Sequence, residues 1–206
     1  MKRLGILLSG RGSNFEAIAR NCASGKLAAE IAIVIANRED AQGLETARKM
    51  GLRVALLPSK GLAREEHDRQ VAAALTAAAV DLVVLAGYMR ILTAWFIAQF
   101  PQRIVNVHPA LLPAFPGLDA QHQAWEYGVR YAGCTVHFVD EKMDSGPILA
   151  QAVVPVFDSD TAETLSNRIL AEEHRIYSEA IALVLDGQFR VEGRRVVRFT
   201  VARNGN

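Results

Sequence analysis

Asn106 and His108 stand two residues apart at the end of a short apolar run that begins at Ile104. Because alternate residues of a strand point to the same side, a strand that reaches His108 places both side chains on one face. A carboxamide can polarise a carbonyl oxygen, and an imidazole can move a proton near neutral pH. The pair therefore suits chemistry at a carbonyl carbon. The same spacing also fits a local arrangement of backbone hydrogen bonds at a strand end.

Asp144 is a second polar position, in an acidic turn between the apolar residues 135–139 and the break at Gly146-Pro147. A carboxylate beside an imidazole orients the ring and favours its charged form. If the fold brings Asp144 to His108, the two side chains and Asn106 form an acid–base site. An Asp-x-Gly sequence is also common in turns that carry no function.

A glycine-containing loop, residues 9–14, joins the apolar run 3–9 to a segment with helical spacing. Ser13 and Glu16 have the spacing of a capping box, which predicts a helix that starts at Ser13 or Asn14 and is closed by Gly25. The free N–H groups at the start of such a helix form an anion site.

The loop is neither a P-loop nor a dinucleotide fingerprint. It has no Gly-Lys-Ser/Thr ending, and Phe15 stands where the third glycine of the fingerprint belongs. The backbone of Gly12, Ser13 and Asn14 fits the phosphate of a monoester. The loop by itself fits a tight turn without a ligand equally well.

Short apolar runs alternate with helical patterns along the first half of the chain. The predicted strands are 3–9, 31–36, 53–57, 81–86 and the run from Ile104, and the predicted helices include 42–50, 64–79 and 93–99. Such alternation implies parallel strands with right-handed crossovers, whose ligands gather at the carboxyl ends of the strands. Residues 9–14, 87–92 and 106–108 should therefore meet at one edge of the sheet.

The second half of the chain has a different pattern. A short helix at 120–127 is followed by strands at 133–139 and 148–156, and a pair joined by the turn with Asp144 is most easily antiparallel. A helix is predicted from about Thr161 to Leu185, with capping spacing from Asp160 to Glu163, and the end of the chain reads as a hairpin at 189–201. The Leu112-Pro113 bond is a candidate for the cis form.

These elements predict one α/β domain over 1–206, with an open, mostly parallel twisted sheet, helices on both faces and antiparallel strands toward the C-terminal part. We expect a phosphate-binding part at about 1–100, a catalytic part at about 101–188 and the hairpin. Residues 64–69 read most simply as a solvated face of their helix, on which Val71, Leu75 and Ala79 form the apolar stripe. The polar cluster of residues 172–174 reads as surface.

The composition excludes several classes of partner. The 206 residues carry 23 basic and 22 acidic side chains, a net charge of +1, which argues against a nucleic-acid groove or an anionic membrane surface. No apolar run is long enough to span a bilayer, and the first residues do not resemble a signal peptide. Cys22 and Cys134 have no metal or CxxC spacing, so free thiols in a reducing cytoplasm are expected.

Taken together, these motifs resemble phosphoribosylglycinamide formyltransferases, a folate-dependent family of purine synthesis. The resemblance runs from Leu7 to about Gly187 and rests on LSGRGSN at 8–14, LAGYMRIL at 85–92, NVHPALLP at 106–113, GCTVHFV at 133–139 and MDSGPI at 143–148. It implies a Rossmann-like formyltransferase fold in a cytoplasmic enzyme, monomer or homodimer. The implied reaction is formyl transfer from 10-formyltetrahydrofolate, a co-substrate, to the glycinamide amine of a ribose 5-phosphate, without a metal.

The resemblance also assigns residues to roles. Asn106, His108 and Asp144 match the catalytic trio, Gly12, Ser13 and Asn14 would hold the phosphate, and Glu173 would face the glycinamide. The folate pocket would be lined by Met89, Arg90, Ile91, Leu92, Asn106, Val139, Asp140, Glu141 and Asp144, with Arg64 and Arg90 facing the glutamate tail. One departure is Gln121, where many relatives are expected to have a histidine, and it puts an auxiliary proton role there in doubt.

Three other functions fit parts of the pattern. A formyltetrahydrofolate hydrolase usually carries an extra regulatory domain, and a methionyl-tRNA formyltransferase a basic extension, for which this nearly neutral chain lacks room. A non-catalytic folate- or phosphate-binding module would not need Asn106, His108 and Asp144 together.

Overall fold

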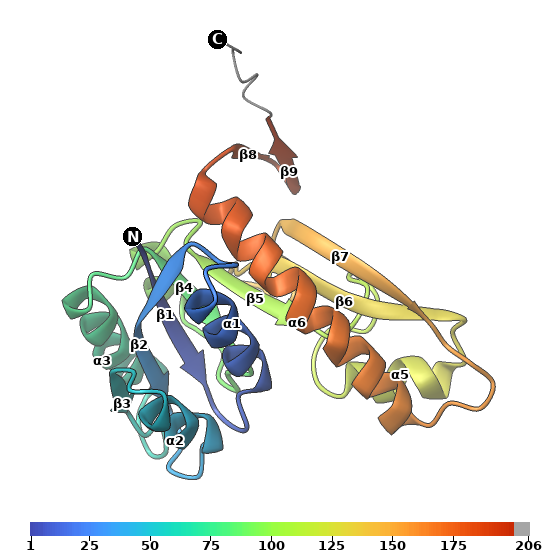
Figure 1. The fold of residues 1–206 in the computed structure, drawn as a ribbon, viewed down its shortest axis with the longest axis horizontal. Coiled ribbons are helices and arrows are strands. Elements are labelled where there is room, and N and C mark those ends of the chain that lie inside the picture. Colours follow the sequence, from blue (N-terminus) through green and yellow to red (C-terminus); the bar gives the residue numbers. More distant parts are fainter. Residues whose placement is uncertain (200–206) are drawn as a thin grey trace.

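The fold is built on one twisted sheet. The structure, a computed structural model, describes residues 1–199, and within this range nine strands are hydrogen-bonded in the order β3-β2-β1-β4-β5-β6-β7-β9-β8 (Figure 1). The strands are β1 Lys2–Leu8, β2 Ala29–Ala36, β3 Val54–Leu56, β4 Leu82–Leu85, β5 Ile104–His108, β6 Tyr131–Phe138, β7 Ile148–Pro155, β8 Phe189–Glu192 and β9 Arg195–Arg198. The helices are α1 Ser13–Ala23, α2 Gln42–Lys49, α3 Arg64–Ala77, α4 Ala94–Gln99, α5 Ala120–Tyr127 and α6 Ala162–Asp186.

The sheet has a parallel half and an antiparallel half, as predicted. Strands β3, β2, β1, β4 and β5 run parallel, whereas β6 pairs antiparallel with both β5 and β7. The order of the parallel strands reverses between β1 and β4, and ligands of such sheets bind in the crevice at the carboxyl ends beside that reversal. The loops after β1, β4 and β5 open at this edge.

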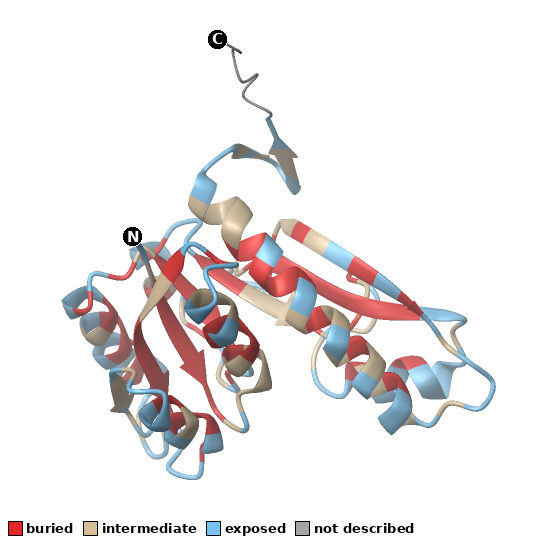
Figure 2. Cartoon of the chain, in the orientation of Figure 1, coloured by how far each residue is buried: buried red, intermediate tan, exposed pale blue. Residues whose placement is uncertain are grey.

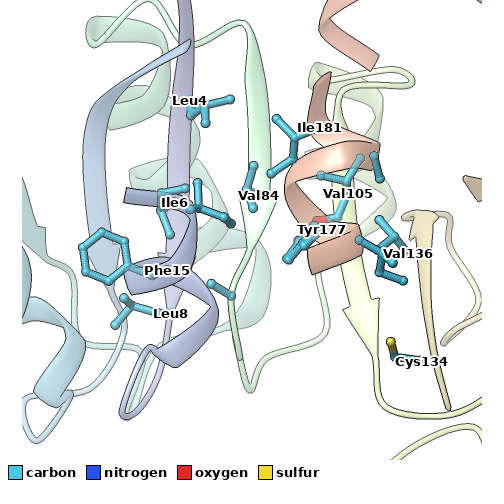
Figure 3. Close-up of a cluster of buried hydrophobic side chains, with 14 of the residues drawn as sticks. Leu4, Ile6, Leu8, Phe15, Val84, Val105, Cys134, Val136, Tyr177 and Ile181 are labelled. Atoms are coloured by element: carbon cyan, nitrogen blue, oxygen red, sulfur yellow. The ribbon is translucent and has the colours of Figure 1, made fainter. Parts of the chain in front are cut away.

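Alternate residues of the buried strands pack into two separate hydrophobic cores, one on each face of the sheet. In β1, Leu4, Ile6 and Leu8 face the core shared with α1, α2 and α6 (Figure 3). Leu7 faces the core shared with α3 and α4. Strands β1, β2 and β4 are buried along most of their length (Figure 2), because helices cover both faces of the parallel half of the sheet. A side chain at Gly5 would collide with Leu75 of α3, which explains the glycine there.

Helix α6 packs against the strands that carry the candidate site, and its Tyr177 side chain links β4 to β5. It runs across β5 and β6 (Figure 1), and the side chain of Tyr177 is fully buried beneath it. The Tyr177 hydroxyl lies 2.8 Å from the carbonyl oxygen of Leu85 and 3.0 Å from that of Val105. One hydroxyl therefore joins the last residue of β4 to the second residue of β5.

The predicted cap of the first helix is wrong, although its first residue is correct. Helix α1 begins at Ser13, but its N-cap is Gly12, which has a φ of 79°, and no side chain caps it. Ser13 already lies inside the first turn because glycine adopts the left-handed conformation that this turn requires. The capping box of Ser13 and Glu16 therefore does not form.

The prediction of a solvated face at the start of α3 is wrong for His67 and Asp68. Both side chains are fully buried. Nε2 of His67 lies 2.8 Å from the carbonyl oxygen of Leu57, and Oδ2 of Asp68 accepts hydrogen bonds from both the backbone N–H and the hydroxyl of Thr93. A neighbouring loop thus satisfies one polar atom of each side chain, whereas Nδ1 of His67 and Oδ1 of Asp68 are buried without a hydrogen-bond partner among residues 1–199.

The apolar stripe of α3 ends at Leu75 and does not include Ala79, contrary to the prediction. Ala79 lies beyond the end of the helix with a φ of 47° and is exposed, whereas Ala78 is buried. The left-handed residue turns the chain into β4, so the stripe continues only from Val71 through Leu75.

Other predictions for the second half are confirmed, with two changes at α6. The Leu112-Pro113 bond is cis, and the hairpin turns at Gly193, although residues 200 and 201 lie outside the described range. The capping box of α6 is formed by Thr161 and Thr164, not by the Asp160 and Glu163 spacing. Within the helix, Glu173 is buried rather than at the surface.

Candidate active site

The antiparallel half of the sheet brings two of the predicted side chains into contact. Strand β5 ends at His108, and the turn between β6 and β7 carries Asp144. Nδ1 of His108 lies 3.4 Å from Oδ2 of Asp144, and the side chains are only 5% and 11% exposed. An imidazole and a carboxylate this close, with little water between them, interact strongly.

Asn106 joins this pair through a residue that sequence reasoning did not single out. His137 of β6 lies opposite Asn106 in the strand register, and its Nε2 is 3.4 Å from Nδ2 of Asn106 and 3.7 Å from Oδ1 of Asp144. Its Nδ1 lies 2.8 Å from the carbonyl oxygen of Phe138. An imidazole two residues after Thr135 in an otherwise apolar strand was the signal in the sequence.

The environment of His137 favours its neutral form. Burial lowers its pKa below the usual 6.5, while the hydrogen bond at Phe138 and the charge of Asp144 act in the opposite direction. A neutral His137 leaves the carboxylate of Asp144 as the charge that faces His108.

The loop after β5 surrounds the other side of His108. Nε2 of His108 lies 2.8 Å from the carbonyl oxygen of Phe115, and the backbone N–H of Gly117 donates to Oδ2 of Asp144 at 2.8 Å. Acceptors therefore face both ring nitrogens of His108. Such an arrangement suits a doubly protonated ring, because an imidazolium has a donor at each nitrogen.

The loop after β1 forms a separate concave site at the N-terminus of α1. A cavity of about 250 Å³ is lined by Ser9, Gly10, Arg11, Gly12, Ser13, Asn14, Arg38, Ala86, Gly87 and Met89. The first backbone N–H groups of a helix have no partners within it, so Gly12, Ser13 and Asn14 present donors to a small anion.

Asn14 links this loop to the centre of the site. Its Nδ2 donates to Oε2 of Glu173 at 2.7 Å, and Glu173, on α6, is only 5% exposed. Burial raises the pKa of Glu173, while the hydrogen bond from Asn14 and the charge of His108 counteract this shift. Oδ1 of Asn14 is buried and has no hydrogen-bond partner among residues 1–199.

The 89–92 segment, which follows β4, presents apolar side chains. Met89 and Ile91 are 65% and 48% exposed, whereas Leu92 is buried. The guanidinium of Arg90 donates to the carbonyl oxygens of Ser59 and Leu62 at 3.3 Å and 3.2 Å. The backbone of the segment is therefore anchored while two large apolar side chains stay free to contact a ligand.

The remaining predicted pocket residues lie in two places. Val139 packs against the core of α3 and α4, and Asp140 accepts hydrogen bonds from the hydroxyl of Ser145. Glu141 is exposed in the same turn as Asp144, and Arg64 is exposed at the start of α3. Arg64 comes directly after the loop of residues 59–62, whose carbonyl oxygens Arg90 contacts.

An imidazole–carboxylate pair and a concave loop at a helix N-terminus fit a group-transfer enzyme with a phosphorylated substrate. Residues 2–181 match the formyl transferase family, and the chain belongs to that family. The chain is 40% identical over 187 residues to the phosphoribosylglycinamide formyltransferase of Escherichia coli, with 90% of this chain and 88% of that protein aligned.

Two further proteins are similar to this chain, one with a solved structure and one that is much longer. The glycinamide ribonucleotide transformylase 1 of Symbiobacterium toebii has a solved structure with a TM-score of 0.94 and 51% identity, covering 97% of this chain and 95% of that chain. The trifunctional purine biosynthetic protein adenosine-3 of Drosophila melanogaster is 42% identical over 190 residues. The chain aligns over 90% of its own length but spans only 14% of that protein.

The described residues include neither a membrane-crossing helix nor a metal-binding cluster. Between residues 1 and 199, no helix combines the length and the apolar character that a membrane crossing needs. Across the same part of the chain, no group of three or more His, Cys, Asp or Glu side chains is placed to hold a metal ion.

Proposed function

We propose that the protein transfers the formyl group of 10-formyltetrahydrofolate to the amine of 5-phosphoribosylglycinamide, as a step of purine biosynthesis. The products are formylglycinamide ribonucleotide and tetrahydrofolate. The observation that supports this best is the hydrogen bond from Asn14 to Glu173, because it joins a phosphate-sized anion site to a buried carboxylate. A substrate with a phosphate at one end and an amine at the other matches this arrangement.

The catalytic roles follow from the charge that develops. When the amine attacks the formyl carbon, a C–N bond forms and negative charge collects on the formyl oxygen. Nδ2 of Asn106 and the protonated ring of His108 are the donors for that oxygen. In other enzymes, removing one such donor costs about 3–4 kcal/mol of transition-state stabilisation. Asp144, 3.4 Å from Nδ1, orients the ring and faces its positive charge.

The second half of the reaction breaks the bond between the formyl carbon and the folate nitrogen. That nitrogen must gain a proton as it leaves, and the attacking amine must lose one. His108 supplies the proton directly or through a water molecule. In the structure, Nε2 faces the carbonyl oxygen of Phe115. If Nε2 donates the proton to the folate nitrogen, the loop that carries Phe115 has to move away.

The acceptor substrate binds along α1 and α6. Backbone N–H groups of Gly12, Ser13 and Asn14 hold the phosphate, helped by the dipole of the 11-residue helix α1. Glu173 holds the glycinamide amine, and as a carboxylate it can also accept the amine's proton.

The folate binds in the pocket on the other side of the trio. Met89, Ile91 and Leu92 supply the apolar wall, which fits a flat pterin because Met89 and Ile91 are largely exposed. The rest of the lining comes from Arg90, Asn106, Val139, Asp140, Glu141 and Asp144. Arg64 and Arg90 face the glutamate tail, and Arg90 would then leave its carbonyl partners.

The proposal extends to organisation and location. We infer one domain, with the phosphate site in residues 1–100 and the folate and catalytic groups mainly in residues 101–188. We also infer a cytoplasmic enzyme that works as a monomer or homodimer on small molecules. The +1 net charge supports the absence of a nucleic-acid partner.

A coupled assay tests the function and separates its rivals. Purified protein is mixed with 10-formyltetrahydrofolate, with and without glycinamide ribonucleotide, and the folate absorbance is followed. A transferase changes the absorbance only when the acceptor is present. A formyltetrahydrofolate hydrolase would react without it, and a binding module would not react at all, so either result refutes the proposal.

A further inference from the structure

Ser9 stands between the loop that would hold the phosphate and the segment that would line the folate pocket. It follows β1 directly and is 3% exposed. Its hydroxyl accepts a hydrogen bond from the backbone N–H of Met89 at 2.7 Å and donates one to Oδ1 of Asn37 at 2.6 Å. Its backbone N–H also donates to the carbonyl oxygen of Gly87 at 3.0 Å.

These bonds belong to a closed ring of contacts. Nδ2 of Asn37 donates to the hydroxyl of Ser59 at 3.1 Å, and the backbone N–H of Ser59 donates to the carbonyl oxygen of Asn37 at 3.0 Å. The carbonyl oxygen of Ser59 accepts from the guanidinium of Arg90, which follows Met89 in the chain. The ring therefore runs from Ser9 to Asn37, Ser59, Arg90, Met89 and back to Ser9.

The other end of the 89–92 segment is fixed by a different group. The carboxylate of Asp68 accepts from both the backbone N–H and the hydroxyl of Thr93, at 2.8 Å and 2.7 Å. Asp68 is fully buried and belongs to α3, which contributes no residue to the phosphate loop. Within residues 1–199, hydrogen bonds therefore connect the segment to the anion site at its Ser9 end.

We propose that Ser9 is a positioning residue that couples the two substrate sites. The inference rests on the proposed function, because it takes the anion loop as the site of the phosphorylated amine and the 89–92 segment as the folate wall. A phosphate held by residues 12–14 restrains the loop that begins at Ser9, and Ser9 then holds the N–H of Met89 in place. Each substrate binds more tightly when the other is present, because each restrains a backbone that the other needs.

The coupling is measured with a pair of ligands that cannot react. Tetrahydrofolate carries no formyl group, so its dissociation constant can be determined by calorimetry with and without saturating glycinamide ribonucleotide. We expect the ribonucleotide to tighten tetrahydrofolate binding by about fivefold or more in the wild-type protein. Reciprocity requires tetrahydrofolate to tighten ribonucleotide binding by the same factor.

Ser9→Ala removes the hydroxyl and should bring this factor close to one, whereas Ser9→Thr keeps a hydroxyl and should restore it. Thr93→Ala is the matched control, because it loosens the other end of the segment. It should weaken tetrahydrofolate binding but leave the coupling factor at the wild-type value. A merely structural role for Ser9 would instead make the two alanine variants behave alike.

Ser59→Ala provides a second test of the same contacts if Ser9→Ala does not fold. It removes the side-chain link from Asn37 to a half-buried position but keeps the backbone link between the two residues, so the coupling factor should fall in part. The proposal is overturned if the wild-type protein shows no coupling, or if Ser9→Ala or Ser59→Ala retains the full factor. Formyl transfer measured on the same wild-type sample distinguishes this failure from a failure of the proposed function, because transfer without coupling would leave the function standing.

Discussion

Replacing Asp144 with asparagine tests the charge in the proposed mechanism without changing the shape of the site. The carboxylate lies 3.4 Å from Nδ1 of His108. At an effective dielectric constant of about 20, two unit charges at that distance attract by about 5 kcal/mol. Each 1.4 kcal/mol of barrier is about tenfold in rate, so loss of the full attraction corresponds to between three and four orders of magnitude.

We expect Asp144→Asn to lower kcat by about 100- to 1000-fold, because the amide dipole retains part of the attraction. Asparagine can still accept the hydrogen bond from Gly117, and it tolerates the φ of 49° at this position. Its urea midpoint should therefore stay near that of the wild type. Neighbouring His137 cannot replace the lost negative charge, because an imidazole side chain is either neutral or cationic.

The assay is the folate absorbance change at saturating concentrations of both substrates. Asp144→Ala serves as a comparison, because it removes the acceptor for Gly117 in addition to the charge and should lower stability as well as kcat. A folded Asp144→Asn variant that keeps kcat within about tenfold of the wild-type value would contradict the electrostatic role.

Three further outcomes are expected. Tyr177→Phe should lower the free energy of unfolding by about 1–2 kcal/mol, because its hydroxyl bridges Leu85 and Val105; an unchanged urea midpoint would show that this bridge contributes nothing. Because burial raises the pKa of Glu173 above 4.5, its stabilising contribution is complete below that pH and is lost as the pH rises through the folded pKa. Glu173→Gln should therefore raise the melting temperature relative to the wild type near about pH 7 but not near about pH 4. The same substitution should weaken binding of the amine substrate. An equal shift of the melting temperature at both pH values would rule out the linkage between the pKa of Glu173 and stability. Burial raises the pKa of Cys134 to about 12, so a disulfide reagent at about pH 8 should label it only in the unfolded protein, and rapid labelling of the native protein would disprove its burial.

The fold class was accessible from the sequence because its signal is local. Apolar runs such as 81–86 and helical stripes such as Val71 and Leu75 record which face of each element is buried. The alternation of these elements then implies parallel strands, and the shared direction of parallel strands brings their following loops to one edge. No long-range information is needed for that step.

Burial of polar residues could not be predicted in the same way. His67 and Asp68 lie in a run of charged residues that reads as solvent-facing. Hydrogen bonds to Leu57 and Thr93 offset the cost of burying their side chains. Glu173 is buried for a similar reason, through Asn14, which is 159 residues away in the chain. Such partners belong to distant segments, and sequence periodicity carries no record of them.

From the sequence alone, the types of group in the site were determined: an amide, an imidazole, a carboxylate and a glycine turn, each at the end of an element. Only the tertiary structure decided how they meet. The antiparallel pairing of β5 with β6 sets His137 opposite Asn106, and the turn after β6 brings Asp144 to His108. Side-chain types and strand ends are written locally in the chain, whereas the register between strands depends on packing across the whole sheet.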